Sequence, residues 1–166
     1  DERMSCERYA LRLDVAAAPS PLCFADTFQG ESCFDLVREA GDFIIKRSDG
    51  VFAYQLAVVV DDAASGIDSV VRGVDLLTST PKQIYLQRLL GLPTPVYGHV
   101  PIFVDESGRK LSKRNKDASL SYLIDDLGLS AEAILGYLAY CSGIIPEWEA
   151  MSIVELKREA CLSALE

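Results

Sequence analysis

The sequence predicts an α/β fold. Between Ile67 and Val104, short apolar runs typical of β-strands alternate with a helical pattern, and from Leu120 onward apolar residues recur at helical spacing. The composition is that of a globular protein, because 49% of the 166 residues are hydrophobic and 25% are charged. This balance excludes a disordered, collagenous or coiled-coil protein and provides enough apolar residues for a sizeable core.

The first part of the chain is predicted to form β-structure. Residues 9–15 alternate between polar and apolar, and residues 22–26 form a second short apolar run. Ser48-Asp49-Gly50 is a turn signal between two further apolar runs, which predicts a hairpin over residues 43–54. Residues 54–62 are ambiguous, because their valines favour a buried strand while the spacing of their apolar residues also suits a helix face.

A β-then-α unit follows. Residues 67–72 are predicted to form a buried strand, and residues 78–81 supply hydroxyl caps and a proline for the first turn of a helix. That helix is expected over residues 83–90 and ends at Gly91. Residues 99–104 are the next strand candidate.

The character of the chain changes after the last predicted strand. The tail from Leu120 is expected to be helical, with breaks at Gly128 and at residues 143–146. We therefore expect two domains, the first over residues 1–116 and a helical extension over residues 117–166.

Charge, length of apolar runs and cysteine usage limit the function. The net charge of −9 argues against binding nucleic acid over the whole surface, since phosphate neutralisation needs an excess of Lys and Arg. No stretch approaches the roughly eighteen apolar residues of a membrane span, and no signal peptide begins the chain, so we expect a cytoplasmic protein without a membrane partner. Five scattered cysteines and a single histidine predict ordinary thiols rather than a disulfide framework or a metal site.

A basic tract stands out in this acidic sequence. Five of the eight residues 109–116 are cationic, in a loop after a predicted strand. Such a loop suits a polyphosphate, because lysine is a point charge on a flexible stem that can follow phosphate oxygens. An isolated basic run is otherwise most often a solvated surface turn.

The tract also carries a family resemblance. Lys110-Leu111-Ser112-Lys113-Arg114 resembles the second signature of class I aminoacyl-tRNA synthetases, in the form typical of the glutamate-specific branch. Four further segments, residues 54–62, 71–76, 79–83 and 99–101, follow the family in order and spacing. The resemblance covers residues 9–145. It implies the C-terminal half of a Rossmann-like catalytic domain with a β-hairpin insertion and a C-terminal helical extension.

The resemblance also implies roles for residues of the basic tract. Lys110, Leu111, Ser112 and Lys113 would bind ATP, which enters with Mg²⁺. Lys113 would stabilise the pyrophosphate leaving group as a glutamate carboxylate attacks the α-phosphorus, and Lys110 would assist. These two lysines are the catalytic candidates.

Two upstream residues are implied to bind glutamate. Arg72 would face its side-chain carboxylate, because a planar guanidinium binds a carboxylate in bidentate fashion, and Tyr54 would add its hydroxyl. Without the resemblance, Tyr54 would be a half-buried core aromatic and Arg72 the partner of a neighbouring aspartate. The candidate aspartates are Asp61, Asp62 and Asp75. His99 is expected to be a structural residue at a strand end.

Three functions remain open. The first is an enzyme that activates glutamate as an adenylate and transfers it to the queuosine base of tRNA(Asp), which Val58 favours because conventional glutamyl-tRNA synthetases usually have asparagine there. The second is a conventional synthetase that charges tRNA(Glu), and the third is a non-catalytic module that binds tRNA or nucleotide. Glutamate, ATP and tRNA are the expected partners of a monomer.

The chain lacks the His-x-Gly-His first signature and the cysteine-rich zinc module of the family. We therefore expect residues 1–166 to be the C-terminal part of a longer enzyme, with any zinc bound in the other part. Mixing this chain alone with glutamate and ATP should give no adenylate, as measured by glutamate-dependent ATP–pyrophosphate exchange. Robust turnover by the chain alone would contradict this expectation.

Overall fold

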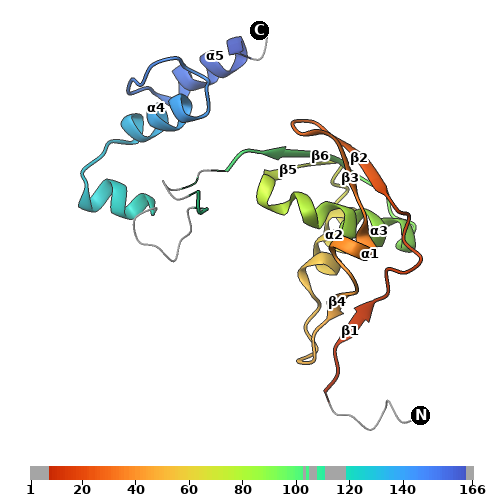
Figure 1. Ribbon diagram of the computed structural model, residues 1–166. Coiled ribbons are helices and arrows are strands. Elements are labelled where there is room, and N and C mark those ends of the chain that lie inside the picture. The colour runs from red at the N-terminus through yellow and green to blue at the C-terminus, as the bar shows by residue number, and fades with distance from the viewer. Residues whose placement is uncertain (1–7, 103, 105–107, 111–118, 164–166) are drawn as a thin grey trace, which may run out of the picture. The chain divides into compact units, whose positions relative to one another are not determined.

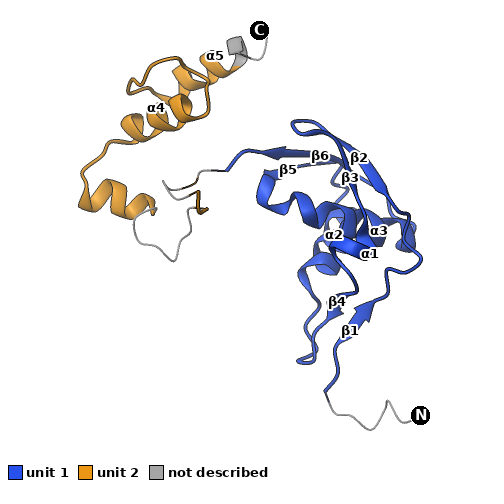
Figure 2. Cartoon of the chain, viewed as in Figure 1, with its two compact units in different colours: residues 1–102 blue, residues 103–166 orange. Residues whose placement is uncertain are grey.

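The computed structural model describes all residues except 1–7, 103, 105–107, 111–118 and 164–166. The chain divides into two compact units, residues 1–102 and residues 103–166 (Figure 2). The first unit contains both sheets and the second contains helices, so the predicted α/β fold with a helical tail is confirmed.

The first unit is built on a mixed four-stranded sheet with the order β3-β2-β6-β5 (Figure 1). Strand β6 pairs in parallel with β5 and with β2, whereas β2 and β3 form an antiparallel pair. A separate two-stranded antiparallel sheet joins β1 and β4. The strands are β1 (Leu11–Leu13), β2 (Leu22–Asp26), β3 (Gly30–Phe34), β4 (Phe43–Lys46), β5 (Ser69–Gly73) and β6 (Val96–Val100).

The predicted β-then-α unit is confirmed between β5 and β6. The connection consists of the 3₁₀ segment η2 (Val74–Ser79) followed by helix α3 (Thr80–Leu90). Gly91 ends α3 with φ 65°, a left-handed conformation that costs glycine little. The expected hydroxyl cap is wrong, because Ser79 at the N-cap forms no side-chain capping hydrogen bond. Strand β5 is also less buried than expected, since it lies at the sheet edge.

The ambiguous segment is a helix, α2 (Tyr54–Ala64). Packing decides this, because Val59 is buried in the core while Leu56 and Val58 pack against it from the same helix. The expected hairpin over residues 43–54 forms only in part. Lys46 and Phe52 form a single antiparallel bridge around the Ser48-Asp49-Gly50 turn, and α2 begins too soon afterwards for a second strand.

One core joins the two sheets to the helices of the first unit. Helices α2 and α3 and the short α1 (Leu36–Glu39) lie on the same side of the four-stranded sheet (Figure 1). The buried apolar side chains come from every one of these layers, so burial of apolar surface stabilises the whole unit. They are Val15, Leu22, Leu36, Phe43, Val59, Ile84, Tyr85, Leu86 and Tyr97.

The expectation of ordinary thiols is wrong for one pair of cysteines. Cys23 and Cys33 form a disulfide bond. They are directly opposite each other on β2 and β3, with Cα atoms 4.1 Å apart. Strand register creates this proximity, and the cysteine count does not reveal it. Glu31 lies near both sulfur atoms, but sulfur atoms joined in a disulfide carry no thiolate to hold a metal ion.

The second unit is helical, as expected. It contains the π-helical turn η4 (Tyr122–Asp126) and helices α4 (Ala131–Cys141) and α5 (Ile153–Ser163). The predicted break at residues 143–146 follows α4, and Gly128 lies between η4 and α4. Ala139, Ile145 and Met151 form a small core. Within the described part of the chain, no helix is long and apolar enough to cross a membrane.

Gly136 allows α4 to approach the backbone after it. A Cβ atom at this position would overlap the carbonyl oxygen of Glu149. Gly136→Ala should therefore reduce the stability of the helical unit by about 1–3 kcal/mol or more, because backbone must move. Thermal unfolding of the chain followed by circular dichroism measures this. Glu132→Ala, an exposed change on the same helix, should shift the unfolding little, and equal shifts for the two variants would contradict the prediction.

Candidate functional site

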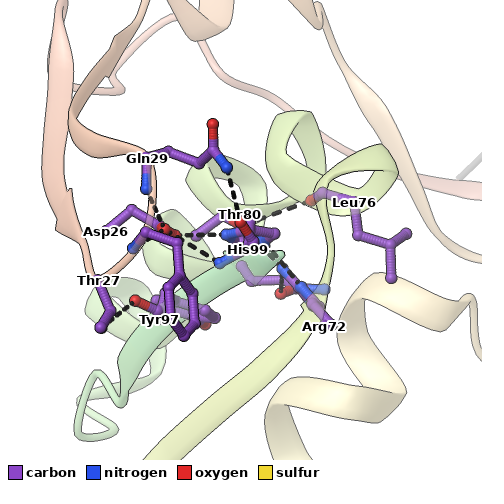
Figure 3. Close-up of polar contacts among 10 residues, drawn as sticks. Asp26, Thr27, Gln29, Arg72, Leu76, Thr80, Tyr97 and His99 are labelled. Atoms are coloured by element: carbon purple, nitrogen blue, oxygen red, sulfur yellow. Dashed lines mark hydrogen bonds and ion pairs between the residues drawn. The ribbon is translucent and has the colours of Figure 1, made fainter. Parts of the chain in front are cut away.

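A row of polar side chains crosses three neighbouring strands (Figure 3). Asp26 ends β2, His99 lies on the central strand β6, and Arg72 lies on the edge strand β5. The parallel register pairs Arg72 directly with His99. Because paired residues of adjacent strands share a face, the register alone brings the guanidinium and the imidazole together.

Asp26 is a buried and fully engaged carboxylate. Its Oδ1 accepts hydrogen bonds from the backbone N–H groups of Phe28, Gln29 and His99, each at 3.0 Å. Its Oδ2 lies 2.5 Å from His99 Nδ1, and both side chains are fully buried. Burial raises the pKa of Asp26, but the hydrogen bonds from His99, Gln29 and Phe28 outweigh it and lower the pKa far below its ordinary value. The carboxylate is therefore ionised.

His99 connects this carboxylate to Arg72. Arg72 Nε donates to His99 Nε2 at 3.0 Å, so Nε2 accepts and the proton of a neutral ring lies on Nδ1, facing Asp26. The Thr80 hydroxyl lies 3.1 Å from the same Nε2 and also contacts the Leu76 carbonyl. The ring is held from three directions.

Helix α3 completes the surroundings of the guanidinium. Arg72 Nη2 donates to Thr80 Oγ1 and to Gln83 Oε1, each at 2.8 Å. Gln83 in turn donates to Gln55 of α2 at 2.9 Å. Thr80 and Gln83 are three residues apart and therefore share one helix face. The guanidinium is thus fixed by strand β6 and helix α3 together.

The acceptors of Arg72 are neutral groups. An imidazole, a hydroxyl and an amide oxygen fix its Nε and Nη2. For Nη1, the structure gives no hydrogen-bond partner within the residues it describes, and the side chain is only partly buried. The guanidinium is oriented while its charge stays available to an anion.

Tyr97 lies beneath the guanidinium. The Arg72 guanidinium carbon is 5.4 Å from the centre of the Tyr97 ring, a cation–π geometry. The hydroxyl accepts a hydrogen bond from Gln87 of α3 at 3.0 Å. Burial raises the pKa of Tyr97, although the hydrogen bond from Gln87 and the positive charge of Arg72 partly oppose this rise. Residues from α3, β5 and β6 therefore meet at Tyr97.

The two predicted glutamate-binding residues both lie in the first unit. Tyr54 begins α2 and is 52% exposed, and the core cluster of the first unit does not include it. Arg72 forms its hydrogen bonds with His99, Thr80 and Gln83. Within the described part of the chain no ion pair joins it to an aspartate, which argues against the alternative that it pairs with a neighbouring carboxylate.

The predicted ATP-binding residues belong to the second unit. Lys110 is exposed and forms an isolated antiparallel bridge with Val104. Leu111, Ser112 and Lys113 lie outside the described residues. Their roles therefore stay predictions.

Sequence reasoning missed the residues that hold Arg72. Asp26 is one of many acidic residues and precedes an ordinary turn, so nothing local identifies it. Thr80, Gln83 and Gln87 do carry a signal, because they recur at helical spacing in a helix whose other faces are also buried. A buried polar stripe of this kind indicates that the facing strand presents a polar side chain.

A family model confirms the resemblance seen in the sequence. The catalytic domain of the class I tRNA synthetases for glutamate and glutamine matches residues 1–157. The chain belongs to this class I synthetase family. The α/β fold, with its parallel strand pairs and helices, fits a class I synthetase catalytic domain.

Curated relatives place the chain near one branch of the family. The Glutamyl-Q tRNA(Asp) synthetase of Cupriavidus metallidurans is 57% identical over 107 residues, which are 64% of this chain and 34% of the relative. That of Thiobacillus denitrificans is 52% identical over 123 residues, 69% of this chain and 41% of the relative. The chain thus spans about a third to two fifths of the length of these relatives.

Solved structures show the same fold. The glutamate-tRNA synthetase of Elizabethkingia anophelis matches with a TM-score of 0.56 and 26% identity, over 66% of this chain and 22% of that one. A glutamate tRNA ligase of Elizabethkingia meningosepticum, solved with its amino acid, matches with a TM-score of 0.58 and 25% identity, over the same shares of the two chains.

The low pKa of Asp26 predicts acid sensitivity of folding. Its ordinary value is 3.8, so its contribution to stability is complete above about pH 4 and is lost as the pH falls toward the much lower folded value. Urea unfolding at pH 7 and pH 3 should show this loss. Asp26→Asn should lower the stability at pH 7 and reduce the difference between the two pH values. An unchanged difference would assign the acid sensitivity to other carboxylates.

Proposed function

We propose that this chain is part of an enzyme that activates glutamate with ATP as glutamyl-adenylate and transfers it to the queuosine base of tRNA(Asp). The observation that carries the proposal is the Arg72 guanidinium, which neutral acceptors orient without cancelling its charge. Such a group suits a carboxylate, because its positive charge and, among the residues described, the two N–H groups of Nη1 are left for an anion while protein acceptors hold Nε and Nη2.

Arg72 and Tyr54 would form the glutamate pocket. Arg72 would bind the side-chain carboxylate through its remaining N–H groups, and Tyr54, exposed at the start of α2, would add a hydroxyl. The guanidinium charge favours an acidic amino acid.

The basic tract would bind ATP, delivered with Mg²⁺. Lys110 and Lys113 would stabilise the negative charge that moves onto pyrophosphate, and Leu111 and Ser112 would shape the loop. The catalytic step needs positioned charges and no general base at the phosphorus. We propose residues 1–116 as the catalytic part and residues 117–166 as the helical extension.

The RNA that accepts the activated glutamate is proposed from Val58 and from the names of the relatives. Val58 lies one helical turn after Tyr54 and packs partly buried against the core. An apolar residue is typical of the queuosine-modifying branch at this position, and the curated relatives carry that activity in their names. A conventional glutamyl-tRNA synthetase is the second candidate, favoured by the solved structural neighbours. A tRNA-binding module without catalysis is the third.

Pyrophosphate exchange separates these functions. The assay uses a full-length enzyme, in which residues 1–166 are joined to the part of a relative that this chain does not span. We expect glutamate-dependent ATP–pyrophosphate exchange without tRNA, because the queuosine-modifying branch activates glutamate alone. Exchange that requires tRNA would support the conventional synthetase, and no exchange under either condition would support the binding module.

The role of Arg72 has a direct test in the same enzyme. Arg72→Ala should raise the KM for glutamate about 10- to 100-fold, as expected for losing a charged hydrogen bond of about 1.5–3 kcal/mol. Arg47→Ala is the matched control, because Arg47 forms an exposed ion pair with Asp49 on the surface. Unchanged glutamate dependence in Arg72→Ala would remove Arg72 from the pocket.

A further inference from the structure

We propose that Asp26 and His99 are positioning residues, which together fix the orientation of the Arg72 guanidinium for its anionic ligand. The inference deepens the proposed function, since it assigns residues that act on glutamate through Arg72. Asp26 lies outside the segments that resemble the family, and His99, which begins the segment 99–101, was expected only to be a structural residue. Three contacts carry the argument, from Asp26 to His99, from His99 to Arg72, and from α3 to Arg72 (Figure 3).

The first step is the choice of tautomer. A neutral imidazole carries one proton, and Asp26 Oδ2 beside Nδ1 attracts it to that nitrogen. Nε2 is thereby left as an acceptor, at 3.0 Å from the Nε–H of Arg72. The carboxylate on one side of the ring and the Nε–H of Arg72 on the other therefore favour the same tautomer.

The second step is the separation of charges. A carboxylate in direct contact with Arg72 would neutralise the guanidinium and compete with an anionic ligand. Here the carboxylate of Asp26 is one imidazole away, and the guanidinium meets neutral acceptors. His99 transmits the orientation and keeps the two charges apart.

The third step is rigidity. Asp26 and His99 have side chains that are fully buried, and Oδ1 of Asp26 is held by three backbone N–H groups. The backbone of His99 is fixed both by this bond and by the parallel pairing of β5 with β6. A group held in this way loses little conformational freedom when the ligand arrives, which favours binding.

Asp26→Asn tests the series of contacts from Asp26 through His99 to Arg72 with minimal change in side-chain volume. The amide oxygen can still accept the backbone N–H groups, while the amide nitrogen faces Nδ1 and donates to it. The His99 proton is then forced to Nε2, where a donor faces the Nε–H of Arg72. The same logic applies to an aspartate that orients a catalytic histidine in a hydrolase triad, where the amide variant selects the wrong tautomer.

The tautomer can be measured without ambiguity, because His99 is the single histidine of the chain. Long-range ¹H–¹⁵N correlation spectra of the 166-residue chain, labelled at histidine, should show a neutral ring protonated at Nδ1. In Asp26→Asn the proton should move to Nε2. Protonation at Nε2 in the unchanged chain would overturn the proposal, and this result needs no variant to fold.

The kinetic readout uses the full-length enzyme. Asp26→Asn should raise the KM for glutamate at least tenfold while kcat at saturating glutamate stays within about threefold, the pattern of lost binding rather than lost folding or chemistry. The matched control is Asp35→Asn, since Asp35 caps α1 by accepting the N–H of Arg38 and asparagine caps a helix equally well. That control should keep the wild-type KM.

The outcomes test the positioning role of Asp26 and His99 separately from the proposed function. A proton on Nδ1 together with a raised KM supports both. A proton on Nδ1 with an unchanged KM for glutamate in Asp26→Asn overturns the positioning role, even if the enzyme is active. Absence of exchange in the unchanged full-length enzyme contradicts the proposed function, while the tautomer in the chain still decides whether Asp26 sets His99 as an acceptor.

Discussion

The buried carboxylate of Asp26 is the interaction on which the candidate site depends. It closes the turn after β2 by accepting two N–H groups of that turn, and it fixes β6 by accepting the backbone N–H of His99. The pairing of β2 with β6 is short, since it consists of Asp26 opposite Tyr97. The Asp26 side chain therefore adds a connection between β2 and β6, which few backbone hydrogen bonds join. The same side chain orients the imidazole of His99.

A buried charge is costly, so its retention needs a physical reason. Removing a carboxylate from water costs several kcal/mol, and only strong, complete hydrogen bonding offsets this. Asp26 meets that condition with three backbone donors and one imidazole donor. A neutral asparagine could satisfy the backbone but could not accept from Nδ1 and from the turn in the same way. The charge is what makes one tautomer of His99 preferred.

The fold and the residues within motifs could be predicted from the sequence. Contacts that depend on the register between strands distant in the sequence could not. Periodicity predicted the β5–α3 unit, whereas β6 begins three residues before the strand that was expected at residues 99–104. The order of motifs identified the family. Residues 54–62 could not be assigned from propensity, because only the core that Val59 enters makes the helix preferable. The Cys23–Cys33 bond and the contact of Arg72 with His99 both result from strand register, which no local pattern encodes.

The buried face of α3 explains why the site needs polar residues inside an apolar core. Ile84, Tyr85 and Leu86 bury apolar surface, whereas Thr80, Gln83 and Gln87 give the same helix a polar stripe. An apolar residue at Gln83 would leave an N–H of Arg72 without an acceptor in a partly buried setting, and an acidic one would neutralise the guanidinium. Neutral acceptors meet both demands, because they satisfy the donors and preserve the charge. The composition of this stripe is thus what a site for an anionic ligand requires, and a site for a neutral ligand would have no need to keep the charge uncompensated.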